Sequence, residues 1–382
     1  MVMDHKSLRS KWITLIGIAA LFVARGWQAI AQEGLSGITV PRVFSPFDRN
    51  VSACSAPSLS KTLAFAQDNE REFIEGVGRG LSMAARERGL TYSRAIAQND
   101  GNKMIEQVES FRSSNTGGLV VAPVDPASLA PAIRRMIWQG AYVGAVVPPP
   151  ATSLLNAPQY LTGKVLGDAA AAHIRDKLNG KANVVLLTHD SLQFLAPRFV
   201  AMRESLKDMP GAAIVADISP VTVNKEGGLK MMQTILLAHP DIDVVLGADT
   251  VVLGALAAVR EAGKIRPDQF FGGIDGEPEA VDEIKKGGPY KISISLASSV
   301  FGYAMGQHAA DWLEGKSIPQ AMDILPSPLT LGNIAQYESD LANPGAVYKD
   351  PVRRDAYLQM YGNICFDSRD QYVNFPWSSE RK

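Results

Sequence analysis

Short apolar runs alternate with longer amphipathic segments through the first part of the chain. The short runs favour strands covered on both faces, and they are Thr62–Gln67, Thr91–Ala97, Gly118–Val121 and Tyr142–Val147. The longer segments are typical of helices, and they are Phe73–Arg88, Asn102–Ser113 and Ser128–Gln139. Regular alternation of strand and helix predicts a doubly wound α/β fold on a parallel sheet.

A second alternating set begins after Pro148-Pro149-Pro150 and a polar stretch that ends at Gly163. Its predicted strands are Ala182–Leu187, Ala213–Ile218, Asp243–Leu246, Phe270–Ile274 and Lys291–Leu296. Its predicted helices are Leu166–Leu178, Leu192–Leu206, Glu226–Ala238, a segment through Val252–Arg260, and a long last helix, Val300–Leu313. The chain therefore predicts two α/β lobes of similar layout.

The two ends of the chain lack this alternation. Residues 32–60 are rich in Pro, Ser and Gly without a clear period, which predicts an extended N-terminal arm over the surface. Residues 332–382 form a C-terminal extension that is too aromatic for a disordered tail. Its aromatic residues include Tyr337, Tyr348, Tyr357, Tyr361, Phe366 and Trp377. We expect this extension to wrap on the folded body as an extra layer.

The N-terminus has the pattern of an export signal. A basic start is followed by the apolar run Ile13–Ala24, which is short for a membrane span, and then by Ala29-Ile30-Ala31. We expect residues 1–31 to be a signal peptide cleaved near Ala31, which places the protein in the periplasm. The alternative is an uncleaved membrane anchor, but Arg25 ends the apolar run early. No second long apolar run follows.

Composition and spacing exclude several classes of function. Lys and Arg total 38 against 39 Asp and Glu, so no basic excess is available to bind a nucleic acid. Five histidines and two cysteines show no metal-ligand spacing, and we expect no metal and no cofactor. The glycines of Gly76-x-Gly78-x-Gly80 lie inside a predicted helix, where phosphate could not reach their amides. They are better explained as small residues that let the helix approach the sheet.

Two aspartates follow parallel strands in the segment Leu236–Ala280. Asp249 comes shortly after the apolar run that ends at Leu246, and Asp275 ends the next predicted strand. In an open α/β sheet, ligands bind at the edge where the strands end. Either aspartate could instead be only a helix cap or a turn residue, which is the commoner role of Asp at such places.

The segment AHPDIDVVLGADTVVLGALAAVREAGK, followed by GGIDG, resembles the second lobe of the ribose-binding-protein-like periplasmic solute receptors. The resemblance covers roughly Lys61–Leu331. It implies the type I periplasmic binding protein fold, in which the chain crosses three times between two lobes. By position the crossings fall near Thr162, near Ala297 and near Pro326–Pro328. The first lobe would then hold residues 61–161 and 297–326, and the second 162–296 and 327–331.

The resemblance also implies a set of ligand-binding residues. In the first lobe these follow the first strand, and in the second they stand at strand ends or a helix start. The set is Asp68, Asn69, Arg71, Phe73, Arg198, Asp249 and Asp275. A carboxylate suits a polyol because it accepts several O–H donors, and an arginine fork donates to ligand oxygens. Lone arginines and loop residues of these types are otherwise most often solvated.

Three positions depart from the family's sugar receptors. Val147-Pro148 stands where they often place an Asp-Arg pair, Val223 replaces an aromatic residue, and Leu296 replaces a Gln. The sequence therefore predicts the receptor fold more strongly than it predicts a sugar ligand.

The resemblance implies a periplasmic receptor that captures a small polar ligand, sugar or sugar-like, and delivers it to an inner-membrane ABC permease. The mechanism would be hinge closure of the lobes around the ligand. We expect a monomer with no catalytic residues. One alternative is a receptor of the same fold that reports ligand to a sensor kinase or chemoreceptor. A less favoured one is a hydrolase that uses Asp249 and Asp275 as acid and base, although no nucleophile–base set is visible.

Cys54 and Cys365 are the only cysteines, and both follow the export signal. One lies in the arm and the other in the C-terminal extension, outside the span of the resemblance. We expect a disulfide between them, because an exported chain meets an oxidising compartment. Two unrelated buried thiols are the alternative.

Overall fold

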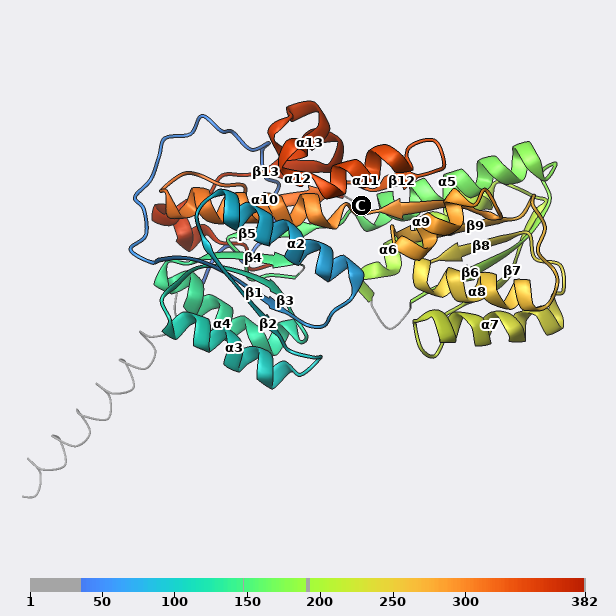
Figure 1. Cartoon of the computed structure of the whole chain (residues 1–382), viewed down its shortest axis with the longest axis horizontal. Helices are drawn as coiled ribbons and strands as arrows, with labels where there is room; N and C mark the ends of the chain where they lie inside the picture. Colours follow the sequence, from blue (N-terminus) through green and yellow to red (C-terminus); the bar gives the residue numbers. More distant parts are fainter. Residues whose placement is uncertain (1–35, 147, 190–192, 381–382) are drawn as a thin grey trace, which may run out of the picture.

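The computed structural model describes residues 36–146, 148–189 and 193–380 (Figure 1). The expected signal peptide, residues 1–31, lies outside the described residues. The chain forms two α/β lobes that lie end to end along the long axis of the molecule (Figure 1). Within the described ranges, no helix is long and apolar enough to cross a membrane.

The first lobe is built on a seven-stranded sheet with the order β13-β11-β5-β4-β3-β1-β2. All neighbours are parallel except β13, which runs antiparallel to β11. The strands are β1 (Ser60–Gln67), β2 (Thr91–Ile96), β3 (Thr116–Ala122), β4 (Tyr142–Val146), β5 (Ser153–Asn156), β11 (Ala321–Ile324) and β13 (Leu358–Tyr361). Its helices are α2 (Glu72–Glu87), α3 (Gly101–Ser113), α4 (Pro126–Gln139) and α10 (Ser298–Leu313).

Local chemistry sets where these helices begin. Asp100 accepts hydrogen bonds from the backbone of Asn102 and Lys103, and so caps α3. Asp125 caps α4 in the same way, and Pro126 follows it at the first helical position. Every residue of β3 is buried, as expected for a strand with helices on both faces.

The second lobe has a six-stranded sheet with the order β12-β10-β9-β8-β6-β7, in which only β12 is antiparallel. The strands are β6 (Ala182–Leu187), β7 (Ala212–Ile218), β8 (Val244–Gly247), β9 (Phe270–Asp275), β10 (Tyr290–Ser295) and β12 (Ser327–Leu329). The helices are α5 (Gln159–Lys177), α6 (Ala196–Lys207), α7 (Lys225–Ala238), α8 (Asp249–Glu261) and α9 (Pro278–Lys285), with a 3₁₀ turn, η1 (Gln193–Leu195), before α6.

Some predicted elements were wrong. The helix predicted over Leu166–Leu178 begins earlier, at Gln159, and the polar stretch before Gly163 contains the strand β5. Gly163 sits inside α5, where a Cβ would lie 1.8 Å from the carbonyl oxygen of Arg198. The glycines of α2 also serve a different contact from the expected one. A Cβ on Gly80 would lie 2.1 Å from the carbonyl oxygen of Ser299, so these glycines mainly admit helix α10 rather than the sheet.

The chain passes between the two sheets at three places before the extension begins. It leaves the first sheet after β5, returns to the first lobe between β10 and α10, and leaves again between β11 and β12. The extension then forms α11 (Ile334–Ala342), α12 (Pro344–Lys349) and α13 (Pro351–Tyr357) and re-enters the first sheet as β13. The extension is therefore more than an outer layer, since it makes a fourth passage and supplies an edge strand.

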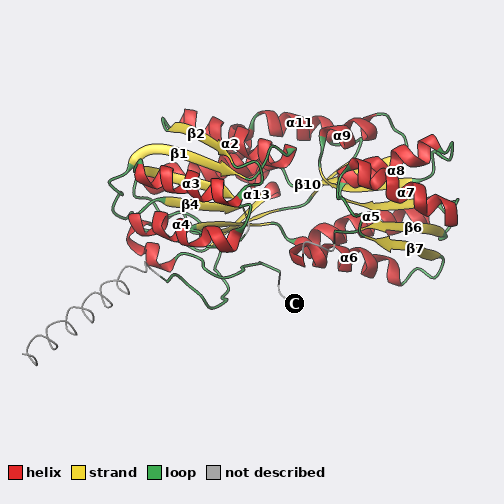
Figure 2. Ribbon diagram, turned by 90° about the horizontal axis from the view of Figure 1, so that it is seen from below, coloured by secondary structure: helices red, strands yellow, loops and turns green. Residues whose placement is uncertain are grey.

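The extension contacts both lobes. Figure 2 shows α11 between α2 of the first lobe and α9 of the second. Glu338 of α11 forms an ion pair of 2.5 Å with Lys285 of α9, and the hydroxyls of Tyr337 and Ser295 share a hydrogen bond. On the first lobe, the ring of Tyr348 packs 5.7 Å from that of Tyr303 in α10.

The arm runs along the end of the extension. The Ile38 amide donates to the carbonyl of Tyr372 at 2.8 Å, and the Phe47 amide donates to that of Met360 at 2.9 Å. Cys54 and Cys365 are joined by a disulfide with a Cα–Cα distance of 6.3 Å across a sequence separation of 311 residues. The expected pairing is thus present in the structure, and it pins the arm to the extension.

We predict that Cys54→Ser/Cys365→Ser lowers the free energy of unfolding. The bridge closes a very long loop, for which the chain-entropy model gives an ideal stabilisation of about 5 kcal/mol, and measured values are commonly lower. Urea unfolding of the oxidised protein, with and without reductant, measures the effect. Reductant should destabilise the natural protein and leave the double variant unchanged. Equal stability of the two oxidised proteins would contradict the prediction.

Candidate ligand-binding site

The loop after β1 is held from behind by a buried amide. Gln67 is fully buried at the end of β1, and its Nε2 donates to the Asn69 carbonyl at 2.6 Å and to Glu75 at 3.1 Å. The Gln67 Oε1 accepts from Arg94 Nε at 2.6 Å. With every polar atom of Gln67 engaged, the loop that follows has a fixed starting point at the edge of the sheet.

The three polar residues of this loop bind one another. Arg71 donates from Nη2 to Asp68 at 2.6 Å and from Nε to the Asn69 Oδ1 at 2.9 Å, and Asn69 donates to Asn99 at 3.0 Å. The Arg71 side chain is 63% exposed, and its Nη1 has no hydrogen-bond partner among the described residues. Phe73 lies half-buried in the first turn of α2, against the core of the lobe. The structure thus brings Asp68, Asn69, Arg71 and Phe73 together.

Arg198 is buried near the start of α6, with 6% of its surface exposed. Its Nε donates to Gln159 Oε1 at 3.0 Å, and its two terminal nitrogens have no hydrogen-bond partner among the described residues. Burial lowers the pKa of the Arg198 guanidinium, while Asp275 opposes that shift. A buried guanidinium with free donors is suited to bind ligand oxygens.

Asp275 is the last residue of β9 and has a left-handed backbone with φ of 118°. It is half-buried, and its carboxylate has no hydrogen-bond partner among the described residues. Burial raises the pKa of Asp275, while Arg198 and Arg71 lower it. Because Arg71 belongs to the first lobe and Arg198 to the second, cations from both lobes act on one carboxylate. This places the loop after β1 opposite the end of β9.

The structure contradicts the expected ligand contact of Asp249. This residue is fully buried at the first position of α8. Its carboxylate accepts from Tyr290 Oη at 2.6 Å, from Ser293 Oγ at 2.6 Å and from the Glu277 amide at 2.9 Å. Burial raises the pKa of Asp249 to about 6. Asp249 therefore ties α8 to β10 and to the loop after β9 from inside the second lobe, and it offers nothing to a ligand.

Two residues at this edge were not predicted from the sequence. Gln159 holds the Arg198 guanidinium through its side chain. Glu277 is half-buried two positions after Asp275, and its carboxyl has no hydrogen-bond partner among the described residues. Burial raises the pKa of Glu277 to about 8, with Asp249 and Asp275 adding to the rise. The sequence did offer a signal for Glu277, because it is an acidic residue directly after Asp275-Gly276.

The positions that depart from the family's sugar receptors contribute little to the description of this site. Leu296 is buried between β10 and α10, and Val223 is half-buried before α7. Val147 lies outside the described residues. Among the residues that are described, no group of three or more His, Cys, Asp or Glu could hold a metal ion.

Comparison with known proteins shows the family of this chain. The model of the periplasmic binding protein domain matches residues 63–321. The chain belongs to the periplasmic binding protein family. This family consists of solute-binding proteins, so the protein is a receptor rather than an enzyme, and the hydrolase alternative is set aside.

Similar proteins span most of the chain. The ribose import binding protein of Bacillus subtilis is 29% identical over 279 residues, which cover 68% of this chain and 82% of that protein. The xylitol-binding protein of Mycolicibacterium smegmatis is 27% identical and covers 68% of this chain and 74% of that protein. A solved ABC transporter solute-binding protein from Bacillus halodurans with bound myo-inositol has a TM-score of 0.64 at 21% identity, covering 75% of this chain and 99% of that one. This likeness confirms the fold of two lobes.

We predict that removing the two aspartates destabilises the unliganded protein to very different extents. Asp249→Ala should lower the free energy of unfolding by about 1–3 kcal/mol for each buried group left without an acceptor. Asp275→Ala should cost much less, because no hydrogen-bond donor among the described residues would lose its acceptor. Urea unfolding of both variants measures the difference. A larger loss in Asp275→Ala would contradict the assignment of Asp249 to the framework and of Asp275 to the ligand.

Proposed function

We propose that this protein captures a neutral polyhydroxylated ligand, a sugar or a cyclic or linear polyol, between its two lobes. The observation that carries the proposal is the Asp275 carboxylate, which has no hydrogen-bond partner in the part of the chain that the structure describes and is acted on by Arg71 from one lobe and Arg198 from the other. A carboxylate accepts only, so it takes ligand hydroxyl protons, while the free guanidinium nitrogens donate to ligand oxygens.

The charges at the site favour a neutral ligand. Arg71 is balanced by Asp68, and Arg198 by Asp275, so the facing residues carry no net charge. With its pKa raised to about 8, Glu277 is mostly protonated at neutral pH and can donate as well as accept. Phe73 offers an aromatic edge to the less polar side of a ligand. The relatives named for ribose and xylitol support the same ligand class.

In this proposal the ligand is passed to an inner-membrane ABC permease. We propose that the protein is exported, that its signal peptide is cleaved near Ala31, and that it acts in the periplasm as a monomer. Ligand that bridges the two lobes stabilises the closed arrangement and thereby shifts the open–closed equilibrium. Asp249 takes no part in binding, so Asp68, Asn69, Arg71 and Phe73 act with Arg198 and Asp275.

Titration calorimetry against ribose, xylitol and myo-inositol tests the ligand class. Arg198→Ala and Asp275→Ala should each weaken binding by about 2–5 kcal/mol, because each leaves a charged partner without its counterpart. Arg203→Ala is a matched control, since Arg203 is on the same helix but is ion-paired with Asp217. Its affinity should be unchanged. Normal binding by both cleft variants, or consumption of the ligand, would refute the proposal.

We predict that a saturating ligand makes the protein more compact, because the lobes are joined by narrow passages about which they can rotate. Small-angle scattering of the oxidised protein with and without ligand measures the radius of gyration. Asp275→Ala at the same ligand concentration is the control and should stay in the unliganded form. An unchanged radius in the natural protein would count against closure.

A further inference from the structure

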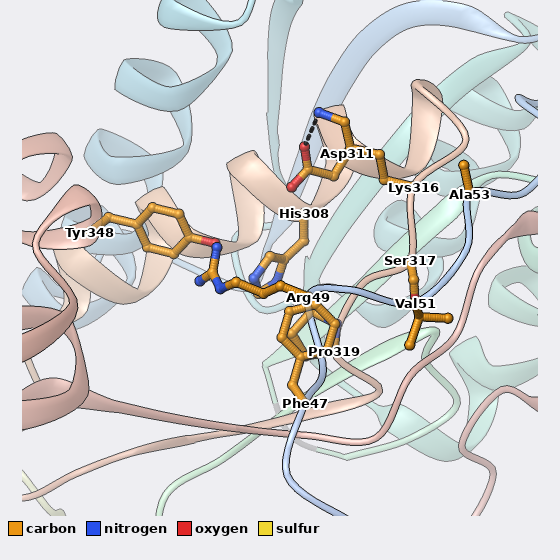
Figure 3. Close-up of a pocket in the computed structure, with 10 residues that line it drawn as sticks. All are labelled: Phe47, Arg49, Val51, Ala53, His308, Asp311, Lys316, Ser317, Pro319 and Tyr348. Atoms are coloured by element: carbon orange, nitrogen blue, oxygen red, sulfur yellow. Dashed lines mark hydrogen bonds and ion pairs between the residues drawn. The ribbon is translucent and has the colours of Figure 1, made fainter.

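A separate cavity lies in the first lobe, between the arm and the end of α10 (Figure 3). Its volume is about 260 Å³. Its lining residues come from the arm, from α10 and the segment after it, and from α12. The floor is His308, ten positions after the start of α10 and so about 15 Å along the helix from the passage between the lobes. The cavity is thus distinct from the proposed ligand site.

The floor of this cavity is an imidazole without partners. His308 is 1% exposed, and within the described ranges neither ring nitrogen has a hydrogen-bond partner. Buried polar atoms in native structures are almost always bonded, and each unsatisfied one costs stability. Burial lowers the pKa of His308 to about 4, so the ring is neutral at pH 7 and carries one N–H donor and one acceptor. A bound molecule that accepts from the N–H would satisfy it.

One positive charge at the cavity is not compensated. Arg49 is exposed on the arm, with its guanidinium 5.9 Å from the ring centres of Phe47 and Tyr348, and it has no ion pair among the described residues (Figure 3). The other charges nearby cancel. Arg88 and Lys316 each pair with both Asp311 and Glu314, which makes a set of two cations and two anions. The lining therefore favours a single negative charge near Arg49.

The remaining lining mixes polar and apolar groups, and the space is small. Phe47, Val51, Ala53 and Pro319 provide apolar surface beside the polar groups. A volume of about 260 Å³ corresponds to roughly eight or nine water molecules in the liquid. This is below the usual volume of sites for drug-sized ligands. Such a space fits a compact molecule with one charged end and a short hydrocarbon end.

We propose that this cavity is a second binding site, which holds a small monocarboxylate with its carboxylate between Arg49 and His308 and its short apolar tail against Val51 and Pro319. Phe47, Arg49, Val51, Ala53 and Tyr348 lie outside the segment that matches the family domain, residues 63–321. The arm that supplies most of them is pinned by the adjacent Cys54–Cys365 bridge. The site is therefore a property of the additions to this chain and goes beyond its receptor function.

Titration of the full oxidised protein with butyrate, followed by calorimetry, tests the site. Arg49→Gln should weaken butyrate binding by at least about tenfold, as expected for a lost charge-assisted hydrogen bond. Arg42→Gln is the matched control, because Arg42 also lies over an aromatic ring of the arm, 5.2 Å from the centre of Phe44, but does not line the cavity. Its affinity should equal that of the natural protein.

Two further variants locate the binding. His308→Gln should weaken butyrate binding. Because His308 is buried, this variant could fail to fold, and Arg49→Gln, at an exposed position, then still tests the site. Asp275→Ala, at the lobe edge, should bind butyrate normally. No butyrate binding by the natural protein at millimolar concentration, equal binding by Arg49→Gln, loss of binding in Asp275→Ala, or preferred binding of inorganic phosphate would each overturn the proposal.

Discussion

The carboxylate of Asp275 lies in the electrostatic field of both lobes. It is half-buried at the end of β9, where burial works against its charge, and the cations that compensate it sit on different lobes. Neither Arg71 nor Arg198 hydrogen-bonds to the Asp275 carboxylate, so the lone pairs of its oxygens are available to a ligand. Its left-handed backbone is unfavourable for an aspartate, and it persists because neighbouring contacts determine it. Among them, the following amide of Gly276 donates to Ser293 Oγ at 3.0 Å.

The C-terminal extension adds contacts on both sides of the passages between the lobes. It begins after β12 of the second sheet and then enters the first sheet as β13, so its helices bridge the lobes. Near the end of the chain, Glu380 accepts from the amides of Tyr160 at 3.1 Å and Leu161 at 2.7 Å, at the start of α5. The same helix start carries Gln159, which holds Arg198. Relative motion of the lobes must therefore deform these contacts or carry the extension with it.

The alternation of apolar and amphipathic segments was sufficient to predict two α/β lobes, because buried strands and covering helices have different periods. It failed at β5 and at the start of α5, where strand, proline-rich loop and helix follow within a few residues and none is long enough to show a period. It also could not separate Asp249 from Asp275. Both follow strands, and only the packing of Tyr290 and Ser293 against Asp249 shows which carboxylate is occupied.

The cavity above His308 was beyond prediction for a related reason. Its walls come from segments far apart in the chain, and nothing in the local sequence around Arg49 or Tyr348 signals that they meet. The disulfide, in contrast, could be predicted from the sequence, because a chain with only two cysteines has a single intramolecular pairing.

That pairing also constrains the order in which the chain is synthesised and oxidised. The partners are 311 residues apart, so an interval separates the synthesis of Cys54 from that of Cys365, and the bridge cannot form before it ends. During this interval the only wrong partner for the Cys54 thiol is another molecule. Formation of the Cys54–Cys365 bridge, for which an external oxidant must take two electrons from the two thiols, therefore reports that the C-terminal extension has been made and has reached the arm.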